Sequence, residues 1–340
     1  MRGVTALLRI DRPGLATSVQ DLGRTGWQRY GVPVSGALDP LAARLANALV
    51  GNEPGEAVLE SLALGPSFTV EAESVRLALV GSDVGLTVDG ARIEAGRSVL
   101  AERGATIAIG GFTDAACCVL AVEGGFDLPK LMGSRSTYAR GGFGGFAGRI
   151  LRPGDALPLA RAAATPGPDR RAGEIPYGQG PMRLVLGPQA DWFEPESVAQ
   201  FLAEPYEITA EADRMGMRLA GPLLRHARGF NIVSDGIVTG ALQVPGTGQP
   251  IVLLADHQTV GGYPKIGTVI SADLPRLGRM RPGATLHFIA VEPAAAETLR
   301  RAQEAEFARL VAAIAPVTAM PRTEDLLEAN LISGVVSAGG

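Results

Sequence analysis

Short apolar runs, separated by turn residues every eight to twelve positions or so, dominate the hydrophobic pattern of this 340-residue chain. That rhythm is typical of the strands of a β-barrel or β-sandwich. An Asp89-Gly90 pair between the runs LTV and ARI predicts a tight hairpin. We therefore expect a mainly β protein with a few helices. The expected strands lie in residues 75–81, 85–90, 98–110 and 116–126, and then in 183–187, 206–221, 231–245, 249–256 and 284–292.

Helical patterns occur in three places. Asp39 followed by Pro40 is an N-terminal capping signal, and leucines then recur at helical spacing until Gly51. Further helices are predicted from about Asp191 to Ala203 and from Ala294 to Ala313.

A stretch rich in Pro, Gly, Ala and charge divides the chain and is typical of an exposed connection. We predict a β-barrel-like domain over residues 1–165, a linker at 166–181, a second β-barrel-like domain at 182–292, and a C-terminal helix and tail at 293–340. Two β-rich domains facing each other would form a cleft between them, a favoured place for a ligand.

Composition narrows the classes of function. A hydrophobic content of 46% with 19% charged residues is ordinary for a folded protein, and a net charge of −4 gives no reason to expect nucleic acid. The apolar runs are far shorter than the ~20 residues that span a bilayer, and the N-terminus lacks the apolar core of a signal peptide. We therefore expect a cytoplasmic protein without membrane contact. Adjacent Cys117 and Cys118 are expected in the core, and no metal site is expected.

Lysine is rare in this chain. Of 31 cationic residues only Lys130 and Lys265 are lysines, so arginine occupies almost every other basic position. Lys265 follows a Gly-Gly-Tyr-Pro turn and precedes an apolar run. Because lysine is a compact charge whose pKa can be tuned, Lys265 is the first residue to suspect of chemistry.

The surrounding segment offers a possible site. Lys265 could hold a carboxylate or a developing oxyanion, Gln258 could bind an amide, and Asp273 or Asp256 could balance the lysine. The alternative is a tight barrel connection in which the lysine only pairs with an aspartate. We assign Lys265 and Asp273 as candidate catalytic residues, and as candidate substrate-binding residues Gln258, Thr259, Gly261, Gly262, Tyr263, Gln243 and Ser234. His257 is interpreted as a surface or packing residue.

A second candidate cluster lies near the N-terminus and consists of Gln20, Asp21, Arg24 and Ser35. Its alternative explanation is structural, with Asp21 and Arg24 as a local ion pair. Asp213-Arg214 is likewise interpreted as a structural turn.

Nucleotide and biotin motifs are missing from the sequence. No Gly-Lys dipeptide exists, which excludes a P-loop, and neither lysine is flanked by methionines as in a biotin attachment site. Residues 142–147 fit G-x-G-x-x-A, but Arg-Pro-Gly at 152–154 interrupts any following helix. ATP or biotin chemistry would therefore need another chain.

Several long motifs carry a family resemblance. They are VQDLGRTGWQRYGVPVSGALDPLAARLANALVGN, EGGFDLPKLMGSRST, DRMGMRL, SDGIVTGALQVP and DHQTVGGYPKIGTVISADLPRLG. Over about residues 8–292 the chain resembles the allophanate hydrolase subunit 2 family. That family includes the C component of bacterial 5-oxoprolinase and the antagonist of the Kip kinase inhibitor, and it is similar to part of the carboxyltransferase domain of urea carboxylase. The resemblance implies cyclophilin-like β-barrel domains.

The same resemblance implies partners and a substrate class. A companion B component, of the allophanate hydrolase subunit 1 family, shares the active site near its interface. In 5-oxoprolinase an A component completes a system in which ATP drives opening of the 5-oxo-L-proline lactam. The leading hypothesis is thus ATP-dependent hydrolysis of 5-oxo-L-proline to L-glutamate, with ATP bound by or shared with the partners. Carboxyl transfer from carboxybiotin to urea or a related amide, with the biotin on another chain, is the second hypothesis. A non-catalytic regulator is the third.

Overall fold

Two antiparallel sheets form the first half of the molecule. The computed structural model describes residues 6–317. One sheet has the strand order β11-β1-β4-β9-β6-β7 and the other β2-β3-β10-β5-β8. Apolar side chains from both sheets, among them Leu8, Phe68, Leu77 and Leu120, fill the space between them. The strands are β1 Leu7–Arg12, β2 Ala16–Gln20, β3 Val58–Leu62, β4 Ser67–Val70, β5 Ser74–Val80, β6 Leu86–Val88, β7 Ala91–Ile93, β8 Ser98–Glu102, β9 Thr106–Ala108, β10 Cys117–Val122 and β11 Ala156–Pro158.

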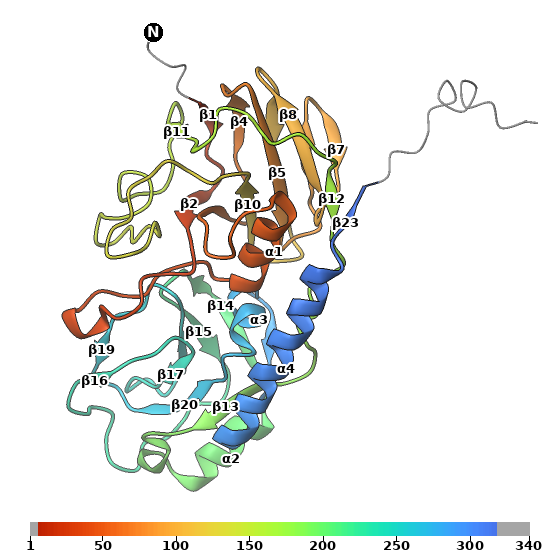
Figure 1. The fold of residues 1–340 in the computed structure, drawn as a ribbon. Coiled ribbons are helices and arrows are strands. Elements are labelled where there is room, and N and C mark those ends of the chain that lie inside the picture. Colours follow the sequence, from red (N-terminus) through yellow and green to blue (C-terminus); the bar gives the residue numbers. More distant parts are fainter. Residues whose placement is uncertain (1–5, 318–340) are drawn as a thin grey trace, which may run out of the picture.

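The second half is built on one eight-stranded, nearly closed barrel-like sheet with the order β21-β14-β15-β18-β17-β20-β13-β22 (Figure 1). Phe201 stacks on Phe288 inside it, with ring centres 4.8 Å apart. A two-stranded ribbon, β16 Asp235–Gly236 with β19 Val260–Gly261, lies beside this sheet. The sheet strands are β13 Met182–Leu186, β14 Tyr206–Ala212, β15 Gly216–Ala220, β17 Ala241–Gln243, β18 Ile251–Leu253, β20 Lys265–Val269, β21 Thr285–Leu286 and β22 Phe288–Ala290.

Several local details of the structure agree with the predictions made from the sequence. The Asp89-Gly90 pair joins β6 to β7, and both residues have positive φ, +48° and +82°. Two such residues in sequence form the turn that matches the twist of a hairpin. Cys117 packs in the apolar core of the second half, and Cys118 packs in the core between the two sheets of the first half, because neighbouring residues of a strand face opposite sides.

The three predicted helices are present with one correction, and two further short helices were not predicted. Helix α1 (Pro40–Val50) is capped by Asp39, which accepts from the backbone N–H groups of Leu41 and Ala42. The segment predicted as one helix from Asp191 is instead a 3₁₀ turn, η2 (Ala190–Trp192), followed by α2 (Pro195–Ala203). Pro195 forces the preceding residue into an extended conformation, which separates the two. The others are η1 Gln28–Tyr30, α3 Leu274–Gly278 and α4 Pro293–Ala312.

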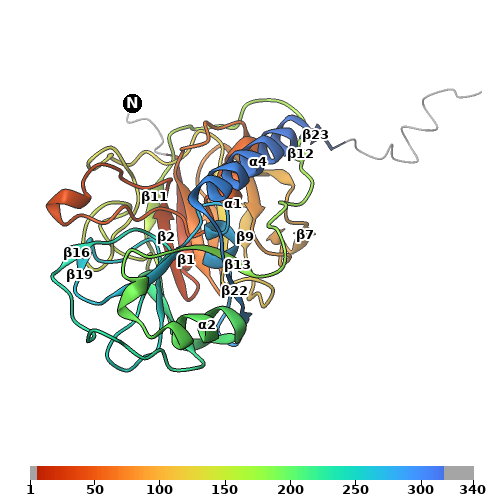
Figure 2. The same ribbon diagram turned by 90° about the horizontal axis from the view of Figure 1, so that it is seen from below.

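Helix α4 runs along both halves of the molecule (Figures 1 and 2). Its Glu304 pairs with Arg44 of α1 at 2.9 Å, and the Arg44 guanidinium lies over the Phe307 ring. At its far end it contacts β13. The predicted linker is not a free connection, because β12 (Arg170–Arg171) pairs with β23 (Ala315–Pro316). The domain boundaries at 165 and 182 stay predictions.

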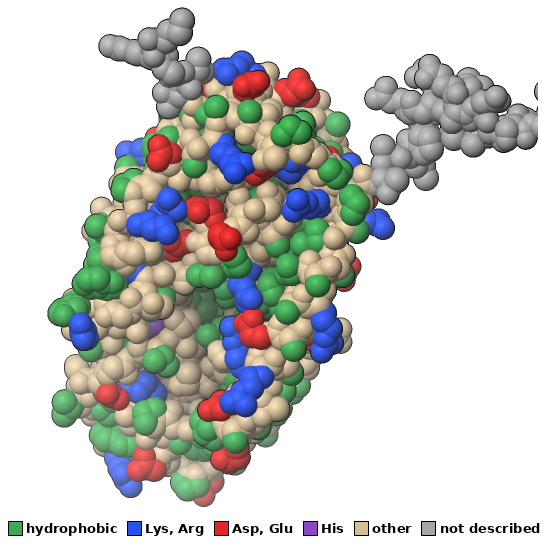
Figure 3. All heavy atoms as spheres, viewed as in Figure 1, with side chains coloured by type: hydrophobic (Ala, Val, Ile, Leu, Met, Phe, Trp, Pro, Cys, Tyr) green, Lys and Arg blue, Asp and Glu red, His purple; other side chains and the backbone are tan. Residues whose placement is uncertain are grey.

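An arm between β2 and α1 connects the halves on the opposite side. It carries η1 from the first half to the β16–β19 ribbon of the second (Figure 1), where the Gln28 Nε2 lies 3.5 Å from the Ile237 carbonyl oxygen. In the space-filling view apolar side chains gather over η1, and the surface beside them is hollowed (Figure 3). Among residues 6–317, no helix combines the length and the apolar character needed to cross a membrane.

Candidate functional site

Lys265 is buried at the start of β20, and its charge is balanced by Asp235. The Lys265 Nζ donates to Asp235 Oδ2 at 2.7 Å and to the Gly236 carbonyl at 3.3 Å, and the Lys265 backbone N–H donates to Gln189 Oε1. The hydrogen bond from Lys265 holds the pKa of Asp235 below its usual value. Neither Asp235 nor Gln189 was predicted from the sequence. The Ser-Asp-Gly turn at 234–236 was the one signal for the aspartate, and Gln189 has none.

Asp273 does not balance Lys265, contrary to expectation. Its carboxylate binds Arg183, with Nε at 3.0 Å and the backbone N–H at 2.8 Å, and Arg276 lies 3.9 Å away. Asp273 immediately precedes α3, which places its side chain against β13. The ion pair therefore ties α3 to β13, and the catalytic role predicted for Asp273 has no geometric support.

Asp256 is also engaged elsewhere. Its carboxylate accepts from the Nε of Arg214 at 2.9 Å, and Arg214 also pairs with Glu60 on β3. Burial opposes the charge of Arg214, but the two carboxylates outweigh it and raise its pKa. Asp213, by contrast, accepts from the backbone N–H of Met215 and closes a turn. Asp213-Arg214 thus has the structural character predicted.

Gln243, Gln258 and Gly261 come together as the sequence suggested. Gln243 pairs with Lys265 across β17 and β20, and its Oε1 accepts from Gln258 Nε2 at 3.1 Å. A Cβ on Gly261 would lie 2.6 Å from Gln243 Nε2, so this close approach of the backbone requires glycine. The Gln243 Nε2 itself is buried without a partner.

A pocket of about 500 Å³ opens beside these glutamines. Gln243, Gln258 and Tyr263 line it from the barrel, and Arg140 lines it from the loop that follows β10. Thr259 contributes a backbone carbonyl to Ile237. The exposed Ser234 is not among the residues that line the pocket. The structure therefore brings three of the seven predicted binding residues to one pocket; outside its lining are Ser234, Thr259, Gly261, Gly262 and the candidate catalytic Lys265.

Asp21 and Arg24 do not form the predicted ion pair. The Asp21 carboxylate accepts from Ser134 Oγ at 2.7 Å, Ser136 Oγ at 2.6 Å and the Arg135 backbone N–H at 2.6 Å. Asp21 therefore fixes a loop more than a hundred positions away, and its acceptors are used there.

Arg24 is 1% exposed and keeps unused donors. Its Nη2 donates to the Ser136 carbonyl, and its guanidinium lies 5.0 Å from the centre of the Phe143 ring. The Nε and Nη1 atoms have no hydrogen-bond partner. Burial lowers the pKa of Arg24, although Asp21 and Asp256 oppose this.

Contacts connect the two predicted clusters into one. Gln20 Nε2 donates to the Thr137 carbonyl, beside the residue that Arg24 contacts. The backbone N–H of Arg24 donates to Val34, and that of Ser35 donates to Ala255, which begins the Lys265 segment. Six of the nine buried side-chain atoms without a partner in residues 6–317 lie along this path: Gln20 Oε1, Arg24 Nε and Nη1, Ser35 Oγ, Gln243 Nε2 and His257 Nε2.

His257 belongs to this group, and of the two roles suggested by the sequence, surface or packing, its burial agrees with the second. It is fully buried, its Nδ1 lies 2.5 Å from the Gln258 carbonyl oxygen, and burial lowers its pKa. Its Nε2 is buried without a partner and is left for a ligand. We call the connected set Gln20, Arg24, Ser35, Gln243, Gln258 and His257 the polar path.

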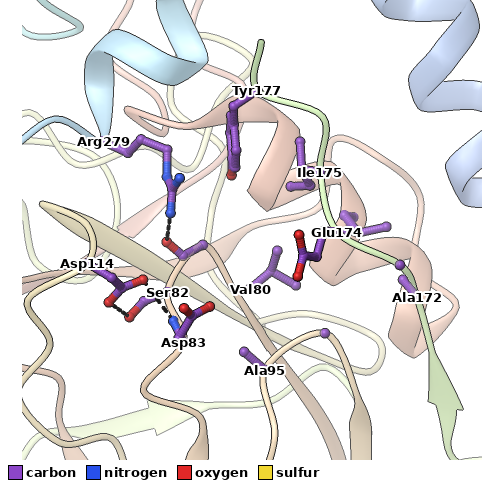
Figure 4. A pocket seen from close by; sticks show the side chains of 14 residues that line it. Val80, Ser82, Asp83, Ala95, Asp114, Ala172, Glu174, Ile175, Tyr177 and Arg279 are labelled. Carbon is purple, nitrogen blue, oxygen red and sulfur yellow. Dashed lines mark hydrogen bonds between the residues drawn. The ribbon is translucent and has the colours of Figure 1, made fainter. Parts of the chain in front are cut away.

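A separate pocket of about 490 Å³ lies where the predicted linker packs on the first half (Figure 4). Tyr177 and Glu174 of the linker face Asp114 and Ser82 across it, and Ser82 donates to Asp114 at 2.7 Å. Arg279 lies over the Tyr177 ring. None of the predicted site residues lines this pocket.

Comparison with known proteins shows which family the chain belongs to. The family described as "Carboxyltransferase domain, subdomain A and B" matches residues 30–290. The chain belongs to this carboxyltransferase family. It is 35% identical to the C component of 5-oxoprolinase from Escherichia coli K12, covering 89% of this chain and 97% of that protein. The resemblance expected from the motifs is thereby confirmed.

Other carboxyltransferase relatives are much longer. Urea amidolyase of Saccharomyces cerevisiae is 31% identical over 87% of this chain, which spans 17% of that protein. The crystal structure of Kluyveromyces lactis urea carboxylase superimposes with a TM-score of 0.83 at 30% identity, over 91% of this chain and 30% of that one. The expected fold, mainly β with two cyclophilin-like barrel domains, is confirmed. Gln20, Asp21 and Arg24 precede the matched residues, and it is their contacts that bring them to the site.

Proposed function

We propose that this carboxyltransferase-family chain is the C component of an ATP-dependent 5-oxoprolinase, which hydrolyses 5-oxo-L-proline to L-glutamate together with companion A and B components. The full-length similarity to the Escherichia coli protein supports this choice. The much longer urea amidolyase shares only a part of its length with this chain.

The polar path is the observation that carries the proposal. Buried polar atoms without partners cost free energy, so they are rarely kept unless something binds them. Gln20 Oε1 can accept the N–H of a lactam, and Gln243 Nε2 can donate to its carbonyl oxygen. Gln258 donates to Gln243 Oε1, which orients the Gln243 amide and leaves Nε2 for the ligand. The set suits a compact molecule with one amide group.

Lys265 supplies the fixed positive charge for the reaction. Opening a lactam places negative charge on its carbonyl oxygen, and a preorganised cation stabilises such charge. Two of the three Nζ donors are used by Asp235 and Gly236. We assign the third donor to substrate; Tyr263 lines the pocket of about 500 Å³, whereas Lys265 is not among its lining residues.

The polar path does not fit ATP. A triphosphate needs several cations or a ring of backbone N–H groups. Here Arg214 is held by two carboxylates and Lys265 keeps one free donor beside Asp235, so in the described residues the polar path offers Arg24 and this one lysine donor, too few for a triphosphate. We therefore assign ATP to the companion subunits and derive no step through it here.

The test is ATP-dependent glutamate release from 5-oxo-L-proline by the purified chain with its companion subunits. Lys265→Ala is expected to reduce kcat by about 100-fold or more, as for loss of one oxyanion donor. Lys130→Ala is the matched control, because Lys130 is the other lysine of the chain and is exposed. Full activity of the Lys265→Ala complex would remove Lys265 from the mechanism.

Carboxyl transfer to urea or a related amide is the second candidate, favoured by the structural similarity to urea carboxylase. In that reaction Lys265 would polarise the carbonyl of the carboxyl donor, and the biotin would sit on another chain. A wild-type complex that releases no glutamate but consumes carboxybiotin in the presence of urea would replace the first proposal by this one.

A further inference from the structure

We propose that Arg24 binds a carboxylate of the substrate, so that the site accepts an amide bearing a carboxylate and discriminates against an uncharged amide. This specificity role rests on the function proposed above. It also separates the two candidate substrates, since 5-oxoproline carries a carboxylate and urea does not.

The first argument is a comparison of the buried cations. Three Lys or Arg side chains are buried among residues 6–317: Arg24, Arg76 and Lys265. Arg76 pairs with Glu123 at 3.3 Å and with Asp169 at 3.5 Å, and Lys265 pairs with Asp235. Within the same residues Arg24 has no carboxylate at ion-pair distance. A buried charge without a counterion is costly, so the site is incomplete until an anion arrives.

The second argument concerns the nearest carboxylates. Asp21 and Asp256 influence Arg24 through space but contact other groups. The Asp21 carboxylate accepts three hydrogen bonds from the loop at 134–136, and the Asp256 carboxylate accepts from Arg214. Neither can swing to Arg24 without breaking these contacts, so we assign the missing counterion to a ligand.

The third argument is the chemistry around the guanidinium. The Ser35 hydroxyl is buried without a partner and follows Val34, whose carbonyl accepts from the Arg24 backbone. We place the carboxylate on the Arg24 N–H groups, and the Ser35 hydroxyl is a second unused donor on the same arm. The adjacent Gln20 Oε1 is an acceptor, which suits an amide N–H rather than an anion. The same segment of chain thus supplies unused groups for an anion and for an amide.

The fourth argument sets the size of the ligand. A Cβ at Gly144 would lie 2.6 Å from the Arg24 Nη2, because the glycine-rich loop passes directly over the guanidinium. Phe143 covers its face. These two contacts close off parts of the guanidinium, which favours a small anion over a large one. The preferred ligand is therefore a compact amide with a carboxylate close to its nitrogen.

The experiment compares two ligands that differ only in the carboxylate, 5-oxo-L-proline and 2-pyrrolidone, by calorimetry on the chain with its companion subunits. The wild type is expected to bind the acid about 10- to 100-fold more tightly, the range of one charge-assisted hydrogen-bonded contact. Arg24→Met should abolish this preference, and Arg24→Lys should restore part of it. Arg301→Met removes an exposed charge of α4 and should leave the preference unchanged.

Several results would overturn the inference. One is a wild type that binds both ligands equally, and another is an Arg24→Met complex that keeps the preference. Thermal unfolding of each variant shows whether it is folded; if Arg24→Met is not, the wild-type ligand comparison and Arg24→Lys decide. Failure of the proposed function looks different: the acid is preferred through Arg24, yet no glutamate is released. Conversely, glutamate release with an unchanged KM in Arg24→Met refutes the role of Arg24 alone.

Discussion

Arg214 of the second half forms a buried ion pair with Glu60 of the first. The same guanidinium also holds Asp256 and the Gly36 carbonyl, so one side chain joins β3, the arm and the Lys265 segment. The arm in turn carries Arg24 and Ser35. The relative position of the two groups of site residues thus depends on a contact that is not itself exposed to substrate.

Removal of this contact is expected to destabilise the protein strongly. Arg214→Met leaves the buried carboxylates of Glu60 and Asp256 without their ion-pair partner, which costs about 3–5 kcal/mol of unfolding free energy. Urea unfolding measures the loss. Arg218→Met is the control, since Arg218 forms an exposed pair with Glu211 that contributes ~1 kcal/mol or less. Equal losses in the two variants would contradict the assigned role.

The sequence predicted local features of the structure but not its long-range pairings. Short-range features were predictable because their causes are local: the Asp89-Gly90 hairpin, the Asp39 cap and the opposite faces of Cys117 and Cys118. The close approach at Gly261 was predictable for the same reason.

Long-range pairing was not predictable in the same way. Several aspartates were possible partners for Lys265 on the basis of sequence. The one it binds, Asp235, lies 30 positions away on a separate ribbon. Asp21 binds Ser136, 115 positions further along the chain, and not the nearby Arg24. Charge type alone does not rank such partners, because burial and backbone direction decide between them. The union of the two clusters therefore needed the three-dimensional structure.

The acid stability of the protein is expected to depend on Asp39. Burial raises the pKa of Asp39 to about 6, and the Tyr177 hydroxyl donates to the same carboxylate. The folded protein thus binds a proton on the Asp39 carboxylate more tightly than the unfolded chain does, because an aspartate of an unfolded chain has a pKa of about 4. The stability that Asp39 contributes is complete below that value and is lost as the pH rises through about 6.

Asp39→Asn tests this linkage because asparagine caps a helix about as well as aspartate but does not titrate. Relative to the wild type, the variant should gain up to about 3 kcal/mol of unfolding free energy between pH 4 and pH 7. Urea unfolding at several pH values gives the difference. A difference that does not vary with pH would show that Asp39 is charged in the folded protein throughout.

Two neighbouring glycines provide a sharp test of the amide site. Gly261→Ala introduces a Cβ 2.6 Å from Gln243 Nε2 and 2.7 Å from Ile237 Cδ1, so the Gln243 amide has to move. We expect affinity for 5-oxo-L-proline to fall about tenfold, the effect of one displaced hydrogen bond. At Gly262 the nearest atom to a new Cβ is 3.4 Å away, so Gly262→Ala should bind almost as the wild type does. Calorimetry measures both, and equal affinities would place Gln243 outside the binding site.

The buried arginines make a final prediction about stability rather than binding. Arg76→Met removes the buried guanidinium that pairs with Glu123 and Asp169 and should cost about 3 kcal/mol, although Glu123 keeps its pair with Arg161. Arg24→Met strands no carboxylate and removes a buried charge that lacks a counterion, so its loss of packing on Phe143 is offset. We therefore expect Arg24→Met to unfold at a urea concentration close to that of the wild type, and well above that of Arg76→Met. Addition of 5-oxo-L-proline should raise the unfolding midpoint of the wild type but not that of Arg24→Met, because only the wild-type guanidinium awaits an anion. An Arg24→Met protein as unstable as Arg76→Met would mean that Arg24 serves the fold, and that its charge is compensated without substrate.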